Sequence, residues 1–232
     1  MATLKTKGAI PIPPTLYKYC APDRIDILEN LAIRFSQPSQ FNDHFDSHFL
    51  VPRDQGSKAK AARSRLKSRL GIFCMTERPN DHLMWVNYAR NHTGFVIGFD
   101  TRAAFFGEDG RVLRKVDYKE TPPVLADANV DACFIKSTVW AGEAEWRCVR
   151  VFESAENRIV DIDASLITHI IFGFRMDDWR IARIAQYTEV YEGASFFRST
   201  PSRSGFVFDS QPIQLAACEH CGGNGYTMTD LD

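Results

Sequence analysis

The stretch GIFCMTERPNDHLMWVNYARNHTGFVIGFD, residues 71–100, combines two apolar segments with a helical pattern between them. GIFCMTE (71–77) and FVIGFD (95–100) are short apolar runs of the kind that form buried strands. Between them, Asp81 precedes the helical pattern HLMWVNYARNH, and Gly94 follows it. The stretch therefore predicts a strand, a short helix and a second strand.

Strands also outnumber helices outside this stretch. TLYKYC (15–20) alternates like a first strand, and EWRCVRVF and THIIFGF add later strands. Because the strands are often consecutive, the sequence predicts an α+β fold and not a parallel βαβ sheet. We expect residues 1–14 to form an extended lead-in, residues 15–215 a single α+β domain, and residues 216–232 a tail.

The composition excludes some classes of protein. The chain has 232 residues, of which 44% are hydrophobic and 25% charged, as in ordinary globular domains. Its 28 Lys and Arg residues balance 29 Asp and Glu residues, so bulk charge favours no class of partner. No run is apolar for long enough to cross a membrane, and the N-terminus lacks the apolar stretch of a signal peptide. We expect a cytoplasmic protein with no membrane partner.

Two glutamates lie two residues apart in KSTVWAGEAEWRCVRVF, residues 136–152. If a strand begins at Gly142 or Glu143, alternation places Glu143, Glu145 and Arg147 on one face. Like charges at this spacing repel each other unless Arg147 or a bound substrate supplies a cation. The pattern fits either a polar outer face with a weak ion pair or the carboxylates of an active site.

A basic segment and an aromatic one each allow two interpretations. SKAKAARSRLKSRL (57–70) is helical by composition and carries six cations and no acid, so it is either a solvated surface helix or a phosphate-binding patch. Trp85, Tyr88 and His92 lie roughly on one helical face. Such a stripe is either core or a wall on which a flat ring stacks.

Two groups of residues have side chains that bind metals. Cys218 and Cys221 form a C-x-x-C pair before a glycine-rich segment, which is half of a zinc site or a pair of free thiols. His44, Asp46 and His48 fall at alternate positions, and no fourth ligand is evident. The sequence thus offers zinc ligands at both places.

Several motifs together resemble a bacterial family known as domain of unknown function 2971. The motifs LYKY, FSQPSQFNDHFD, LMWVNYARNHTGFVIGFD, KSTVWAGEAEWR and IIFGFRM occur in the family's order between Leu16 and Met176. The chain departs from the family pattern at His44, where a proline is usual, and at Gly142, where members often have an aromatic residue. The C-x-x-C pair lies outside the resemblance.

The order of three sequence positions also resembles, more loosely, the order found in ADP-ribosyltransferases. In this resemblance an aromatic and basic first strand corresponds to Tyr17, Lys18 and Tyr19, a middle Ser/Thr to Thr76, and a late glutamate to Glu145. It implies a compact, mostly antiparallel, split β-sheet with flanking short helices that binds NAD. It also implies transfer of ADP-ribose from NAD to an unknown acceptor, a protein or a nucleic acid, in toxin or anti-phage conflict.

The same resemblance assigns roles to the side chains. Glu145 would stabilise the sugar cation formed when nicotinamide leaves, and Glu143 would orient or deprotonate the acceptor. Tyr17, Tyr19, Trp85 or Tyr88 would stack on the rings of NAD. The pyrophosphate would be held by Lys18, Arg34 or Arg147. The alternative is a nucleic-acid-binding or nuclease-like accessory protein that uses the basic helix 57–70.

Overall fold

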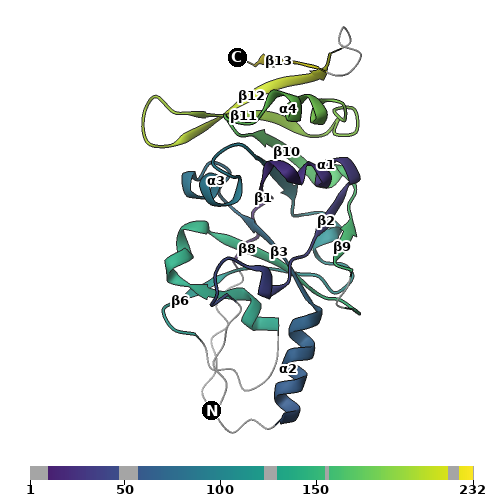
Figure 1. Cartoon of the computed structure of the whole chain (residues 1–232), viewed down its shortest axis with the longest axis vertical. Helices are drawn as coiled ribbons and strands as arrows, with labels where there is room; N and C mark the ends of the chain where they lie inside the picture. Colours follow the sequence, from purple (N-terminus) through teal and green to yellow (C-terminus); the bar gives the residue numbers. More distant parts are fainter. Residues whose placement is uncertain (1–9, 47–56, 123–129, 155–156, 219–224, 232) are drawn as a thin grey trace.

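A nine-stranded sheet runs along the molecule (Figure 1). The structure is a computed structural model and describes residues 10–46, 57–122, 130–154, 157–218 and 225–231. The strand order is β13-β12-β11-β10-β4-β1-β3-β8-β5, with β10 and β11 parallel and the other neighbours antiparallel. The strands of this sheet are β1 (Thr15–Cys20), β3 (Leu70–Thr76), β4 (Phe95–Asp100), β5 (Val112–Lys115), β8 (Glu145–Val151), β10 (Ile167–Phe172), β11 (Ser195–Pro201), β12 (Phe208–Ala217) and β13 (Tyr226–Asp230). The expected α+β class with a mostly antiparallel sheet is confirmed.

The main core lies against the central strands. Leu16, Phe73, Phe99, Trp146 and Ile170 come from five different strands of the sheet and belong to one buried cluster. Each large apolar side chain contributes about 1.5–3 kcal/mol when it is fully buried. Burial of these side chains explains why the apolar runs around residues 71–77 and 95–100 form strands.

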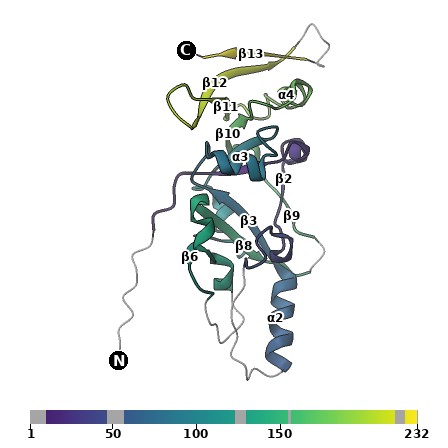
Figure 2. The same cartoon turned by 60° about the vertical axis from the view of Figure 1, so that its left-hand side comes forward.

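Short helices and two small sheets surround the main sheet. The helices are α1 (Asp26–Asn30), α2 (Ser57–Arg69), α3 (His82–Tyr88) and α4 (Asp178–Ala185). The small sheets pair β2 (Ala32–Arg34) with β9 (Ile159–Asp161), and β6 (Asp117–Lys119) with β7 (Ile135–Ser137). α3 begins where the Asp81 carboxylate accepts a hydrogen bond from the Met84 N–H at 3.1 Å. α2 projects from one end of the molecule, opposite the end that carries α4 and β11 to β13 (Figures 1 and 2).

The segment expected to be a tail contains a strand. β13 pairs antiparallel with β12, from Ile213–Asp230 to Ala217–Tyr226, and forms one edge of the sheet. Residues 225–231 therefore extend the sheet. In the described part of the chain, no helix has the length and apolar character that crossing a membrane requires.

Two glycines let backbone segments approach each other near the sheet. A Cβ at Gly94 would overlap the Cys20 carbonyl oxygen, and a Cβ at Gly173 would overlap the carbonyl oxygen of His92. We expect Gly94→Ala to lower the free energy of unfolding by about 1–3 kcal/mol or more, because backbone atoms must move. The matched control is Gly193→Ala, whose Cβ would meet nothing within 4 Å and should change stability by less than about 0.5 kcal/mol. Equal urea midpoints for the two variants would contradict the close approach at Gly94.

Candidate functional site

The two strands β1 and β3, near the middle of the sheet, share very few backbone pairs. β1 pairs with β4 at all six of its residues, but among the described residues its one registered pair with β3 is Tyr17–Thr76. β3 pairs with β8 along its whole length, and there Thr76 lies opposite Glu145. Tyr17, Thr76 and Glu145 thus form one row across three adjacent strands. Beyond this row no further registered pair joins β1 to β3 among the described residues.

A cavity of about 260 Å³ lies beside the sparsely paired strands β1 and β3. Lys18 spans the gap between the strands, because its Nζ donates a hydrogen bond to the Cys74 carbonyl oxygen at 3.3 Å. Aromatic side chains and carboxylates both line the cavity; they include Tyr17, Tyr19, Phe41, Tyr88, Asp43, Asp46, Glu143 and Glu145. The cavity therefore combines apolar surfaces that suit a ring with acceptors that suit hydroxyl groups.

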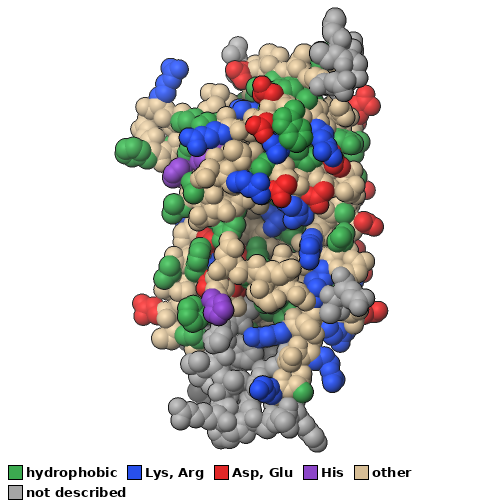
Figure 3. All heavy atoms as spheres, in the orientation of Figure 1, with side chains coloured by type: hydrophobic (Ala, Val, Ile, Leu, Met, Phe, Trp, Pro, Cys, Tyr) green, Lys and Arg blue, Asp and Glu red, His purple; other side chains and the backbone are tan. Residues whose placement is uncertain are grey.

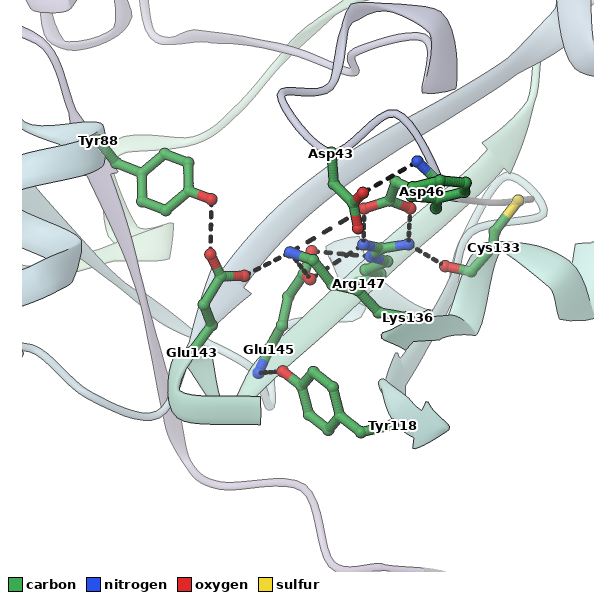
Figure 4. Close-up of polar contacts among 10 residues, drawn as sticks. Asp43, Asp46, Tyr88, Tyr118, Cys133, Lys136, Glu143, Glu145 and Arg147 are labelled. Carbon is green, nitrogen blue, oxygen red and sulfur yellow. Dashed lines mark hydrogen bonds and ion pairs between the residues drawn. The ribbon is translucent and has the colours of Figure 1, made fainter. Parts of the chain in front are cut away.

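Lys136 joins the two glutamates at the wall of the cavity (Figure 4). Its Nζ lies 2.5 Å from Glu143 Oε2 and 3.0 Å from Glu145 Oε2. The Tyr88 hydroxyl donates to Glu143 Oε1 at 2.6 Å. Lys136 is the middle residue of β7, and the hydroxyl of Tyr118, on neighbouring β6, accepts from the Glu145 N–H at 2.8 Å. The small sheet thus fixes both the cation and the start of β8.

Arg147 lies behind Glu145 and is completely buried, with 0% of its surface exposed. It donates to the Glu145 carboxylate at 2.8 and 2.9 Å and to the Asp46 carboxylate at 2.7 and 2.5 Å. A fifth hydrogen bond reaches the Cys133 carbonyl oxygen at 2.6 Å. These contacts use all five N–H donors of a guanidinium. Arg147 therefore fixes the orientation of Glu145 and ties the loop that carries Asp46 to the sheet.

The cluster of Asp46, Lys136, Glu143, Glu145 and Arg147 has three formal negative charges and two formal positive charges, a net charge of −1. Burial raises the pKa of Glu145, but the charges and hydrogen bonds of Arg147 and Lys136 outweigh it and lower this pKa to about 2. Burial lowers the pKa of Lys136, yet the two glutamates leave it above its ordinary value. Glu145 is therefore an ionised carboxylate in a nearly dry environment.

The ionised Glu145 makes the fold sensitive to acid. Its pKa is about 2 in the folded protein and 4.5 ordinarily, so the unfolded chain binds more protons between these values. The stabilisation is complete above about pH 4.5 and is lost as the pH falls toward 2. In Glu145→Gln we expect the slope of unfolding free energy against pH to be smaller across this window than in the parent. Urea unfolding at several pH values measures it, and equal slopes would contradict the assignment.

Most of the residues singled out from the sequence meet at the cavity. Those that line it are Tyr17, Lys18, Tyr19, Tyr88, Glu143 and Glu145. Glu143 does not belong to the strand, contrary to the expectation. It ends a 3-10 helix over Thr138–Glu143, and β8 begins only at Glu145. Ala144, with φ of 45°, turns the chain between the two glutamates. Strand alternation was therefore the wrong reason for placing them together.

Four other candidates do not line the cavity. Trp85 is buried, packs T-shaped against Tyr19 with ring centroids 5.2 Å apart and stacks on His92 at 5.4 Å, so it belongs to the core and has no face free for a ligand. Thr76 is buried, and its hydroxyl donates to the Glu143 carbonyl oxygen at 2.6 Å. Arg147 is fully occupied, and Arg34 is exposed on β2. The predicted contact of Arg147 with a pyrophosphate is wrong for this structure, because no N–H of its guanidinium remains available.

Sequence reasoning missed two members of the cluster. Lys136 and Asp46 are 7% and 9% exposed and complete the ionic network, but neither was assigned this role. Asp46 lies 101 residues before Arg147, and nothing in the local pattern connects them. For Lys136 a signal existed, since one cation precedes two closely spaced glutamates by seven and nine residues.

The metal-binding predictions rest partly on residues that are not described. Cys221 and His48 lie outside the described residues, and Cys218 is half-buried. Among the residues that the structure describes, no group of three or more His, Cys, Asp and Glu side chains is arranged to hold a metal ion. Zinc binding by Cys218 and Cys221 stays a prediction.

Comparison with known proteins gives one match. No curated protein and no solved structure matches the chain. Residues 84–148 match the model of a family described as "Protein of unknown function (DUF2971)". This segment contains α3 from Met84 onward, all of β4 and the start of β8, together with Tyr88, Lys136 and both cavity glutamates. The family resemblance drawn from the motifs is confirmed over this segment, where the chain is similar to the family described as Protein of unknown function (DUF2971).

Proposed function

We propose that the protein cleaves the nicotinamide–ribose bond of NAD and transfers ADP-ribose to an acceptor. The observation that carries the proposal is the row Tyr17–Thr76–Glu145 across β1, β3 and β8. These residues occupy the three sequence positions on which the loose resemblance to ADP-ribosyltransferases is based. Their meeting beside a cavity in a mostly antiparallel sheet supports this resemblance.

The electrostatics of the site suit the transition state of this reaction. The bond between ribose C1′ and the nicotinamide nitrogen breaks heterolytically, and its electron pair leaves with nicotinamide. The ribose then carries positive charge, as in glycoside hydrolysis. Glu145 is ionised, oriented by Arg147 and only 4% exposed, so its charge is weakly screened. A fixed carboxylate at this place stabilises the developing sugar cation.

The lining of the cavity suits a ribose with an aromatic base. Asp43 lines the cavity, and its Oδ2 is buried and has no hydrogen-bond partner among the described residues. A buried acceptor of this kind is normally satisfied, and a sugar hydroxyl is a donor that would satisfy it. Tyr17 and Tyr88 offer apolar ring surfaces beside it. A cavity of about 260 Å³ is smaller than a typical ligand pocket of about 300–1,000 Å³, so it would enclose one end of NAD.

Transfer requires that the acceptor lose a proton as it attacks C1′. Glu143 lies nearest the Tyr88 side of the cavity and is held by the Tyr88 hydroxyl and Lys136. In the proposed reaction Glu143 accepts the acceptor's proton, a general-base role. The products are then nicotinamide, the ADP-ribosylated acceptor and one proton.

Incubation of the purified protein with NAD tests the proposal. Chromatography is expected to detect free nicotinamide, and mass spectrometry an ADP-ribose adduct on any acceptor present. Water serves as acceptor when no other is supplied, so nicotinamide release does not depend on knowing the acceptor. A role in toxin or anti-phage conflict predicts lower NAD in cells that express the protein. If nicotinamide is not released and cellular NAD stays unchanged, the proposal is wrong.

A further inference from the structure

A set of positively charged side chains near α2 has no acidic partner among the residues that the structure describes. Lys60 and Arg65 are exposed on α2, Arg69 ends it, and Arg34 and Arg150 lie on β2 and β8. None of these five described residues forms an ion pair, and neither do Glu153 and Asp161 in the neighbouring segments. We call these five cations the basic stripe.

Cations elsewhere on the surface are largely neutralised. The ion-paired ones include Arg24, Arg90, Arg102, Arg114, Lys119 and Arg183, each within 4 Å of a carboxylate. The chain as a whole has a formal net charge of −1. Arg175, Arg198 and Arg203, in or after β10 and β11, also form no ion pair among the described residues, so the basic stripe is the larger of two groups of unpaired cations. Figure 3 shows Lys and Arg side chains following one another from the level of β2 and β9 down to α2.

Strand pairing and hydrogen bonds place residues of the basic stripe near the end of α2. Arg150 lies opposite Gly71, directly after α2, and Arg158 donates to the Leu70 and Ser68 carbonyl oxygens at the end of the helix. Arg69 donates to the Phe152 carbonyl oxygen at 2.6 Å. Arg34 pairs with Ile159, the residue after Arg158, and burial together with the charge of Arg34 lowers the pKa of Arg158. The base of α2 is thus anchored while the helix projects from the body (Figure 2).

Like charges one helical turn apart, such as Arg65 and Arg69, destabilise a helix unless an anion compensates them. α2 has 13 residues, so it is about 20 Å long and can follow a row of phosphates. Its exposed positions carry no aromatic side chain that would stack on unpaired bases. It also has no large apolar face of the kind that holds a helix at a lipid surface. These features favour a phosphate backbone over single-stranded bases or a membrane.

We propose that the basic stripe binds the phosphate backbone of a nucleic-acid duplex without reading its sequence. Contacts of this kind release counterions, so the affinity falls steeply with salt. A helix that stands clear of the body can enter a major groove about 12 Å wide while Arg34 and Arg150 contact the flanking backbone. This surface is separate from the cavity, so the inference stands or falls independently of NAD cleavage.

Fluorescence anisotropy tests the inference with a labelled DNA duplex of about 20 base pairs, a duplex RNA of equal length and vesicles of anionic lipid. We expect duplex binding at low salt with a steep logarithmic salt dependence. The triple variant Arg34→Gln, Lys60→Gln, Arg65→Gln should bind at least about tenfold more weakly at low salt. Its salt slope should be about 3 smaller, because each cation that neutralises a phosphate adds about 0.9 to the slope. All three side chains are exposed, so circular dichroism should be unchanged.

The matched control removes three ion-paired cations, in Arg24→Gln, Arg102→Gln, Arg183→Gln. It lowers the net charge equally and should leave the salt slope unchanged. The inference is overturned if the parent does not bind either duplex at low salt, or if both triple variants lose affinity equally. Binding to anionic vesicles but to neither duplex would also overturn it and would identify a lipid surface as the partner.

Discussion

Replacing Arg147 by methionine is expected to lower the free energy of unfolding by about 3–5 kcal/mol, because two buried carboxylates lose their shared partner. The side chain is 0% exposed, and its five hydrogen bonds hold Glu145, Asp46 and the Cys133 carbonyl group. Methionine fills a similar volume but leaves both carboxylates without this cation. Urea denaturation of parent and variant measures the difference.

Arg114→Met is the matched control. Arg114 lies directly opposite Arg147 on β5 and forms an ion pair with Asp131, but both side chains of this pair are half-exposed. An exposed pair contributes about 0–1 kcal/mol, so the control should unfold close to the parent. Arg147→Lys should fall between the two, because it keeps the charge and loses the planar fork. If Arg147→Met and Arg114→Met unfolded at the same urea concentration, the buried network would contribute nothing to the fold.

The central strands were predictable because their patterns are local. The apolar runs at residues 15–20 and 95–100 became β1 and β4 with the expected bounds. The edge strand β13 was not predictable, since Thr227, Met228, Thr229 and Asp230 are exposed and show no burial pattern. Its pairing with β12 is determined by the rest of the fold and not by its own sequence pattern, as is common for edge strands.

The site was predictable in part, for the same reason. Glu143 and Glu145 stood out because like charges close in sequence need a cation, and the structure supplies Lys136 and Arg147. Other features were hidden. Asp46 reaches Arg147 from a distant loop, and Trp85 is core because it is buried between Tyr19 and His92. Sequence spacing gives no information on contacts of this kind.

Replacing Glu145 by glutamine is expected to reduce the rate of nicotinamide release about 100–1,000-fold if the proposed function is correct, comparable to the loss of one fixed electrostatic group in other enzymes. Glutamine keeps the shape of the side chain and removes the negative charge that would face the sugar cation. The loss should appear in kcat, with KM nearly unchanged, because the charge acts on the transition state. Steady-state assays over a range of NAD concentrations separate the two constants.

The difficulty is that Glu145 also supports the fold, since its carboxylate binds both Arg147 and Lys136. Asp46→Asn separates the two effects, because it removes a carboxylate from the same guanidinium and leaves Glu145 ionised. We expect Asp46→Asn to lose stability to a similar extent while its kcat stays within about tenfold of the parent. Near-ultraviolet circular dichroism at the assay temperature checks that each variant is folded. If the two variants lost kcat equally, Glu145 would act through the structure of the cluster, and its charge would have no special part in the chemistry.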